Sequence, residues 1–259
     1  MIAPPGHVLV TGAGGAIGAA LTRAMRATWP AAALALVDRD AERMTALATE
    51  VGNATTHGVD LADVAALPAL VAAIEAAGGP LDGLVNCAGI MQVQQLQTWR
   101  WEEAERLVAV DLLAPLRLQD LCARGMVQRG RGIIVNIASM AGKVPLRGCT
   151  YYGAAKAGLA MASEIARADL APHGVHVVTV YPGPVKSALE QGARDAYGGG
   201  GLLGKLAPTG DPAELARRIL HALEHDEPRV IYPRVYGVGW SATNLSSWIA
   251  LSYGPPPVN

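Results

Sequence analysis

The sequence has no phenylalanine and only three cysteines in 259 residues. Cys87, Cys122 and Cys149 lie far apart and show no CxxC spacing, which argues against a disulfide framework or a metal site. So sparse a set of cysteines is typical of a cytoplasmic protein. Lysine is also rare and the net charge is −1, so the composition offers no surface for nucleic acid.

Long apolar runs are missing too. No stretch reaches the roughly 18 uninterrupted apolar residues that a membrane span requires, and residues 1–7 lack the layout of a signal peptide. Hydrophobic residues nevertheless make up 51% of the chain, enough for a large core. At this length we expect one α/β domain over residues 1–259.

Short apolar runs alternate with longer amphipathic segments along the chain. Strands that are apolar throughout and separated by helices are typical of a parallel sheet covered on both faces. The strands are expected at 7–11, 33–38, 54–59, 81–86, 132–138, 175–181 and 229–232. The helices are expected at 16–28, 41–51, 61–77, 100–128, 149–171 and 211–225. We therefore predict a doubly wound parallel sheet of about seven strands.

A glycine-rich loop joins the first predicted strand to the first helix. Glycines allow a tight turn there, and the amides of a helix N-terminus bind a pyrophosphate. The loop therefore predicts a dinucleotide site, formed by Gly12, Gly14, Gly15, Ala16, Ile17 and Gly18.

Acidic residues after the next two strands extend this site. Asp38 ends the second strand, where a carboxylate accepts hydrogen bonds from the adenosine ribose and repels a 2′-phosphate. Arg39 beside it would instead favour that phosphate. NAD and NADP therefore both stay open, and we favour NAD. Asp60 and Leu61 are candidates for the adenine contact, and Asp60 is equally a candidate N-cap for the helix that follows.

Tyr152 and Lys156 lie four residues apart on a predicted helix, so they share one of its faces. The Lys156 ammonium is expected to lower the pKa of the Tyr152 phenol from its usual value of ~10. Ser139, at the end of the preceding strand, can hold a substrate oxygen beside that phenol. The three residues predict a general acid/base for an alcohol or a carbonyl, although Tyr-x-x-x-Lys alone is also an ordinary surface pair.

Together, these motifs resemble the short-chain dehydrogenase/reductase family in its single-domain form. The family's TGxxxGxG motif is similar to residues 11–18, its NxAG motif to residues 86–89 and its PGxVxT motif to residues 182–187. The resemblance implies a Rossmann fold and an oxidoreductase that uses NAD or NADP.

The resemblance also implies a role for each matched residue. Tyr152 would give or take the proton, Lys156 would bind the nicotinamide ribose, and Ser139 would orient the substrate oxygen. Asn86 would stabilise the sheet near the cofactor. The other implied cofactor contacts are Ala88, Gly89, Pro182, Gly183, Val185 and Ser187.

Two positions depart from the family pattern. Ala16 replaces a glycine near the pyrophosphate. Asp111 stands where the family usually has an asparagine that completes the catalytic set, and we include Asp111 in that set. Its carboxylate is expected either to stabilise the Lys156 cation or to be protonated by burial, with neutral drift as the alternative.

Apolar side chains are expected to line the substrate site, which favours a hydrophobic secondary alcohol or its ketone. The candidates are Met91, Met140, Leu146, Cys149, Pro184 and Leu189. Residues 187–207 include four consecutive glycines and are expected to act as a lid. Residues 233–259 form an apolar tail. Such a tail can close the pocket, touch a membrane surface or pack against another subunit.

Alternatives to this function remain open. One is an NADPH-dependent reductase that acts on a biosynthetic keto group, either free or bound to a carrier. Another is a non-catalytic protein that senses a nucleotide with the same fold. Members of the resembled family commonly form dimers or tetramers, so we expect a homodimer or homotetramer and favour the subunit contact for the tail.

Overall fold

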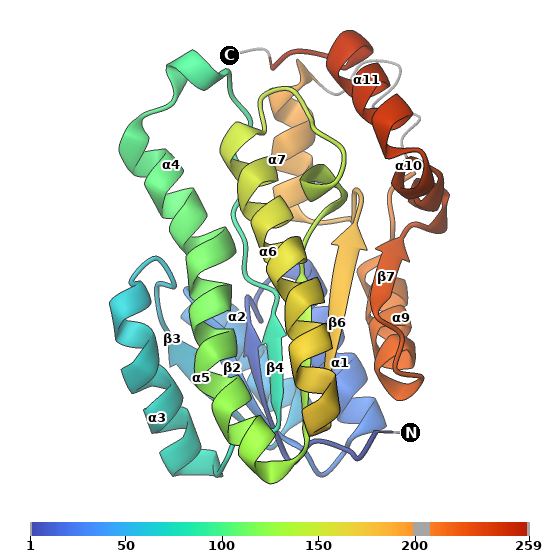
Figure 1. Cartoon of the computed structure of the whole chain (residues 1–259). Helices are drawn as coiled ribbons and strands as arrows, with labels where there is room; N and C mark the ends of the chain where they lie inside the picture. The colour runs from blue at the N-terminus through green and yellow to red at the C-terminus, as the bar shows by residue number, and fades with distance from the viewer. Residues whose placement is uncertain (1, 199–207, 258–259) are drawn as a thin grey trace.

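A computed structural model gives the fold and describes residues 2–198 and 208–257 (Figure 1). Seven parallel strands form one sheet in the order β3-β2-β1-β4-β5-β6-β7. This order confirms the predicted sheet, and every strand ends within two residues of its predicted bounds. The strands are β1 (His7–Thr11), β2 (Ala33–Asp38), β3 (Ala54–Gly58), β4 (Gly83–Asn86), β5 (Gly132–Ile137), β6 (Val175–Pro182) and β7 (Arg229–Tyr232).

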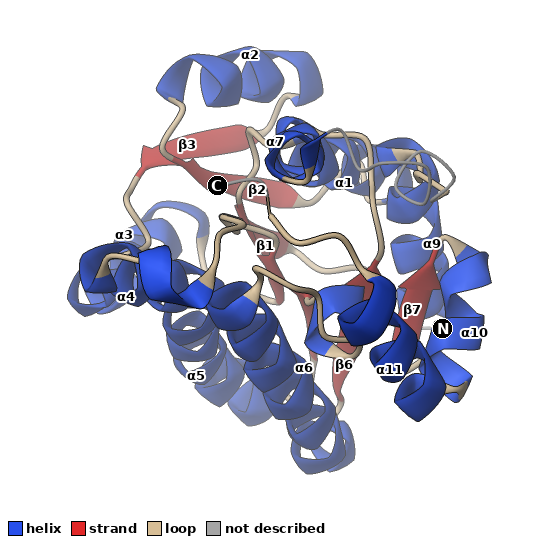
Figure 2. Ribbon diagram, turned by 90° about the horizontal axis from the view of Figure 1, so that it is seen from above, coloured by secondary structure: helices blue, strands red, loops and turns tan. Residues whose placement is uncertain are grey.

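Helices cover both faces of the sheet, as Figure 2 shows from above. One face packs against α1 (Ala16–Thr28), α2 (Ala41–Val51) and α9 (Pro212–Glu224). The other packs against α3 (Leu67–Gly78), α5 (Ala114–Arg129) and α6 (Thr150–Leu170). Apolar side chains from the strands and helices fill both layers, because the central strands β1, β4, β5 and β6 are buried on both sides, whereas the edge strand β3 is largely exposed.

Two predicted helices begin or continue differently from expectation. The helix predicted over 100–128 is α4 (Trp101–Val108) followed by a π-helical turn (Ala109–Leu113) that leads into α5. The helix predicted from residue 61 begins with a 3-10 turn at Val64–Ala66, before α3. Asp63 caps that turn by accepting the Ala66 N–H, so the prediction of Asp60 as the N-cap was wrong.

The C-terminal segments are more helical than their composition indicates. The predicted lid begins with α7 (Ala188–Ala196), while residues 199–207, with most of the glycine run, lie outside the described part. The apolar tail contains α10 (Gly237–Ser241) and α11 (Thr243–Tyr253), which lie near the carboxyl ends of the strands in Figure 1. Among the described residues, no helix has the length and apolar character needed to cross a membrane.

A row of buried polar residues crosses the centre of the sheet. Thr11, Asn86, Asn136 and Thr179 are paired in register on β1, β4, β5 and β6. The Asn86 amide donates to the Asn136 oxygen at 2.8 Å, and both Asn136 and Thr179 reach the Ser163 hydroxyl of α6. Because these groups are hydrogen-bonded, they hold α6 at one position on the sheet. Asn86 thus lies at the centre of the sheet, where its amide joins β4 to β5 and to the Pro115 carbonyl of α5.

Candidate active site

The glycine-rich loop lies between β1 and α1, where the strand order reverses from β1 to β4. Gly12 has φ of 65°, and a Cβ on it would lie 2.7 Å from the Ala88 backbone. A Cβ on Gly18 would lie 2.1 Å from the Gly12 carbonyl oxygen. The loop therefore requires glycine at both positions, because the backbones approach each other closely.

The N-terminus of α1 has room and donors for an anion. Gly15 is its N-cap, and no side chain accepts a hydrogen bond from the first amides. Gly15 and Ala16 are both exposed, so the Ala16 methyl is compatible with the fold of the loop. This open helix start fits the pyrophosphate of a dinucleotide.

Asp38 is held beside this loop by backbone donors. Its Oδ2 accepts the Gly14 N–H at 3.0 Å, and its Oδ1 accepts the N–H groups of Arg39 and Asp40 at 2.7 and 3.1 Å. The carboxylate is therefore positioned at the end of β2, while the Arg39 residue is exposed. Both residues lie where the ribose of a dinucleotide would be expected.

Asp60 and Leu61 fit the adenine prediction less well. Arg106 of α4 binds both oxygens of Asp60, at 2.9 and 3.1 Å, and holds the pKa of that carboxyl below its usual value. Leu61 is buried in the core between the sheet and α3. If the Asp60 carboxylate also contacted an adenine, it would have to bind the adenine and Arg106 at the same time.

Ser139, Tyr152 and Lys156 come together at one cavity beyond the carboxyl end of β5. Lys156 Nζ lies 5.9 Å from the centre of the Tyr152 ring and donates to the Ile137 carbonyl at 3.1 Å. The Ser139 hydroxyl contacts the phenol and accepts the Ala141 N–H. The four-residue spacing on α6 and the end of β5 thus bring the three groups into one site.

The direction of the Tyr152 pKa differs from the sequence expectation. Burial raises the pKa of the phenol, and the nearby Asp111 carboxylate raises it further. Lys156 lowers the pKa, as predicted, and the Ser139 hydroxyl also lowers it, but the two effects do not outweigh burial and Asp111. The prediction of a net downward shift was therefore wrong, because it left out burial and the charge of Asp111.

Asp111 lies in the π-helical turn and has no exposed surface. Its Oδ1 lies 3.4 Å from Lys156 Nζ. Burial raises the pKa of Asp111 to about 6, against the opposing effects of Lys156 and the Ile90 N–H. Asp111 is not among the residues that line the cavity, so it touches Lys156 rather than a substrate.

The cavity has a volume of about 570 Å³ and a mainly apolar lining. Five predicted substrate residues line it, namely Met91, Met140, Leu146, Pro184 and Leu189. Cys149 does not, since it is buried with its Sγ 3.3 Å from the Tyr197 hydroxyl. The predicted cofactor residues that also border this cavity are Ile17, Gly89, Pro182, Gly183, Val185 and Ser187.

Sequence reasoning left open that the tail closes the pocket, but it named none of the residues of the far wall. This wall consists of Ala193 from α7 and Tyr197 directly after that helix, with Tyr236, Gly239, Ser246 and Pro255 from the C-terminal segment. These residues carry no motif or spacing that marks a site, and only the tertiary packing brings them to the cavity. The tail therefore closes the pocket, while Trp248, Ile249 and Tyr253 of α11 stay exposed.

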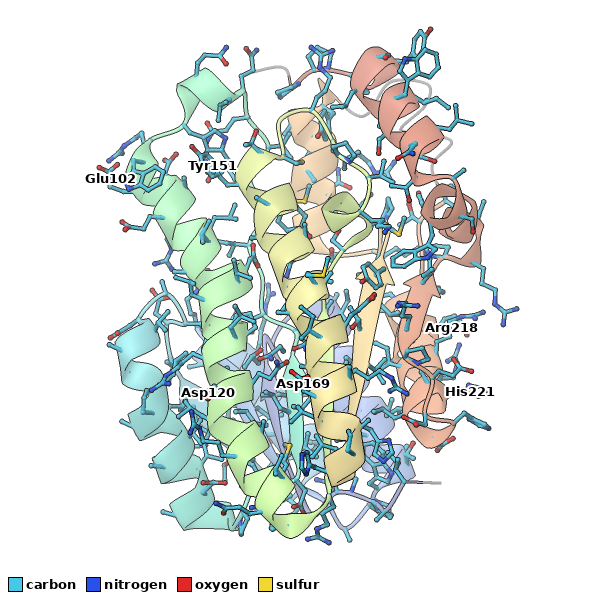
Figure 3. All side chains as sticks on the ribbon, viewed as in Figure 1. Glu102, Asp120, Tyr151, Asp169, Arg218 and His221 are labelled. Atoms are coloured by element: carbon cyan, nitrogen blue, oxygen red, sulfur yellow. The ribbon has the colours of Figure 1, made fainter. Side chains whose placement is uncertain are left out.

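Tyr151, the neighbour of Tyr152, points away from the site. Figure 3 shows it directed from α6 toward the start of α4, near Glu102. Its ring packs edge-on against Trp99 and Trp101, with centroids 5.1 and 6.3 Å apart. Tyr151 therefore points in a different direction from Tyr152, the tyrosine at the cavity.

Comparison with known protein families identifies this architecture. A family model described as short chain dehydrogenase matches residues 6–198. The chain belongs to the short-chain dehydrogenase family. It is therefore an oxidoreductase of CH–OH groups that uses NAD or NADP, as the family does.

Individual relatives are similar to this chain in sequence and in structure. The chain is 34% identical over 206 residues to the D-threitol dehydrogenase of Mycolicibacterium smegmatis, covering 78% of each chain. It is 29% identical to a short-chain dehydrogenase from Sphingobium yanoikuyae solved with NADPH, with a TM-score of 0.77 and 95% of both chains covered. A bulky-bulky ketone specific alcohol dehydrogenase from Comamonas testosteroni is 26% identical, with a TM-score of 0.76, covering 97% of this chain and 95% of the other.

Proposed function

We propose that this short-chain dehydrogenase interconverts a bulky, hydrophobic secondary alcohol and its ketone, with Tyr152 as the general acid/base. The observation that carries the proposal is the opening of Ser139 and Tyr152 into a large cavity with a mainly apolar lining. A cavity of about 570 Å³ suits a ligand with substantial groups on both sides of the carbonyl. The ketone named for the Comamonas relative supports the same substrate class.

The cofactor NAD(P)H, when bound, supplies the hydride for the carbonyl carbon, and side chains of this protein handle the proton and hold the substrate. Tyr152 donates its phenolic proton to the carbonyl oxygen in reduction and takes the alcohol proton in oxidation. Ser139 donates a hydrogen bond to the same oxygen. The Lys156 ammonium stabilises the phenolate that Tyr152 becomes when it gives up its proton, and solvent supplies the proton that restores the phenol. Gly15 and Ala16 would hold the pyrophosphate, with Val185 and Ser187 beside the nicotinamide.

The first experiment is a fluorescence titration of the purified protein with NADH and NADPH, followed by turnover assays. The substrates are aryl alkyl ketones of increasing size, their secondary alcohols, and small polyols such as D-threitol. We expect turnover to rise with ketone size up to the volume of the cavity. Turnover of polyols without turnover of bulky ketones would contradict the proposed substrate. Cofactor binding with no turnover across the whole panel would favour a non-catalytic role instead.

We also propose that NAD is preferred over NADP, because the Asp38 carboxylate is held at the end of β2 by three backbone donors. A fixed negative charge there repels a 2′-phosphate. The complex of the Sphingobium relative with NADPH keeps NADP as the alternative, with Arg39 as its ligand.

Asp38→Asn should shift the cofactor preference toward NADPH. Removing the charge is expected to change the ratio of the Kd values for NADH and NADPH by roughly tenfold, equivalent to about 1.4 kcal/mol. Fluorescence titration of both cofactors measures this ratio. Asp40→Asn is the matched control, because its carboxylate caps α2 two residues further on. An unchanged ratio in Asp38→Asn would remove Asp38 from cofactor selection.

Two further parts of the proposal concern the assembly and the compartment. We propose that the chain forms a homodimer or homotetramer, since α6 exposes Met161 and Ile165 and α11 exposes Trp248 and Ile249 on their surfaces. Analytical ultracentrifugation tests this, and a monomer at micromolar concentration would contradict it.

The cytoplasmic location also stays a prediction, supported by the free thiols of the three cysteines.

A further inference from the structure

A buried ion pair lies directly behind the proton-transfer site. Asp111 Oδ1 lies 3.4 Å from Lys156 Nζ, and the two side chains are 0% and 5% exposed. The same oxygen accepts the Ile90 N–H at 3.1 Å. Asp111 Oδ2 is buried and has no hydrogen-bond partner among the described residues. A carboxylate placed in this way depends on Lys156 for most of its stabilisation, because burial penalises an unpaired charge.

The backbone leaves room for this contact at Gly89. A Cβ at that position would lie 2.7 Å from Asp111 Oδ1 and 3.3 Å from Lys156 Nζ. A side chain there would force the Asp111 carboxylate to shift from its present position beside Lys156. The direct pairing of Asp111 with Lys156 therefore depends on a glycine in the segment that follows β4.

The charges that act on the Tyr152 phenol come from two elements. Lys156 contributes a positive charge from α6, and Asp111 contributes a negative charge from the π-helical turn. The other titratable groups facing the pair are neutral thiols. Burial raises the pKa of Cys87, after β4, to about 12, and it also raises the pKa of Cys149 before α6. The carboxylate thus opposes the field of the ammonium at the phenol.

We propose that Asp111 is a positioning residue that holds Lys156 in place and offsets the charge of its ammonium at Tyr152, so that the phenol, the proton donor for ketone reduction, is favoured over the phenolate that alcohol oxidation needs. The inference rests on the proposed function of Tyr152. An asparagine at this position would still accept a hydrogen bond from Lys156 but would leave its positive charge unopposed. The carboxylate therefore changes the state of the proton donor without touching the substrate.

The direction of the pH dependence follows from the proton that each reaction needs. Oxidation requires the phenolate, so its rate rises as pH approaches the raised pKa of Tyr152. Reduction requires the phenol, so its rate holds through neutral pH and falls only on the alkaline side. Below about pH 6, Asp111 itself takes up a proton and its effect on Tyr152 disappears.

Asp111→Asn tests this assignment through pH profiles of kcat/KM for oxidation and for reduction. We expect the rising limb of oxidation to move to lower pH by about 1 unit or more, the usual effect of one nearby charge. That shift corresponds to roughly tenfold faster oxidation on the limb at a given pH. The alkaline fall of reduction should move in the same direction. Below about pH 6 the profiles of the two proteins should converge.

Asp82→Asn is the matched control, because Asp82 is another buried carboxylate with ion pairs, to Arg129 and Arg131, remote from the cavity. The midpoints of the pH profiles of Asp82→Asn should equal those of the wild type. Superimposable midpoints for Asp111→Asn and the wild type would overturn the proposal even if both proteins turn over substrate. Failure of the proposed function itself would be recognised separately, by full turnover in a Tyr152→Phe protein.

If Asp111→Asn proves unstable, absorbance titration of tyrosine ionisation in wild type and in Asp111→Glu replaces the assay. An unchanged phenolate midpoint in Asp111→Glu, with its carboxylate displaced from Lys156, would also overturn it.

Discussion

Tyr152→Phe should retain cofactor binding and lose nearly all turnover. The substitution removes one buried hydroxyl and keeps the ring, so the packing of this α6 side chain in the wall of the cavity is preserved. Loss of a general acid/base typically lowers the rate by roughly 10²–10⁴-fold. Steady-state kinetics in both directions measure the loss, and fluorescence titration with the cofactor shows that the binding site is intact.

Tyr151→Phe is the matched control for this experiment. Tyr151 occupies the preceding position on α6 and packs against Trp99 and Trp101, away from the cavity. Its loss of a hydroxyl should leave kcat and KM close to the wild type. Comparable turnover in the two variants would show that neither phenol transfers the proton, and the proposed mechanism would then be discarded.

Gly18→Ala should remove most cofactor binding by deforming the loop after β1. The new methyl carbon would lie 2.1 Å from the Gly12 carbonyl oxygen, a backbone atom that cannot turn aside as a side chain can. The loop must therefore separate from α1, and its amides would no longer have the geometry that a pyrophosphate needs at the helix N-terminus. The Kd for NADH measures the effect. We also expect a lower Tm, since overpacking typically costs about 1–3 kcal/mol.

Gly58→Ala provides the control for adding a methyl group elsewhere. Gly58 ends β3, and a Cβ there meets no atom within 4 Å. Its Kd for NADH and its Tm should stay close to those of the wild type. A cofactor affinity in Gly18→Ala equal to that of Gly58→Ala would mean that the loop does not bind the pyrophosphate.

The sequence predicted the fold well because each strand is locally distinct. The runs at β1 and β2 are apolar throughout and are bounded by glycine or by a capping residue such as Asp40, so their limits follow from local chemistry. The α1 and α2 bounds were predicted residue for residue for the same reason. The meeting of Ser139 and Tyr152 at one cavity could also be predicted, because Ser139 follows the end of a strand and Tyr152 lies on one face of the next helix.

Contacts between distant segments could not be predicted from local patterns. Arg106 binds Asp60 because α4 crosses the loop after β3, a contact that depends on tertiary packing. The raised pKa of Tyr152 depends on burial and on Asp111, neither of which a helical spacing reveals. The closure of the cavity by Tyr236 and Pro255 required the path of the C-terminal segment.

The two walls of the cavity come from separate stretches of the chain. The side with Ser139 and Tyr152 is built before the end of β6, whereas the opposite wall is built from α7 and the C-terminal segment. Substrate range can therefore diverge by replacement of one contiguous C-terminal portion, while the proton donor and the nucleotide loop are inherited intact. Chimeras joined after Ser187 would carry the α7 and C-terminal lining of one parent on the reaction centre and the proposed nicotinamide contacts of the other.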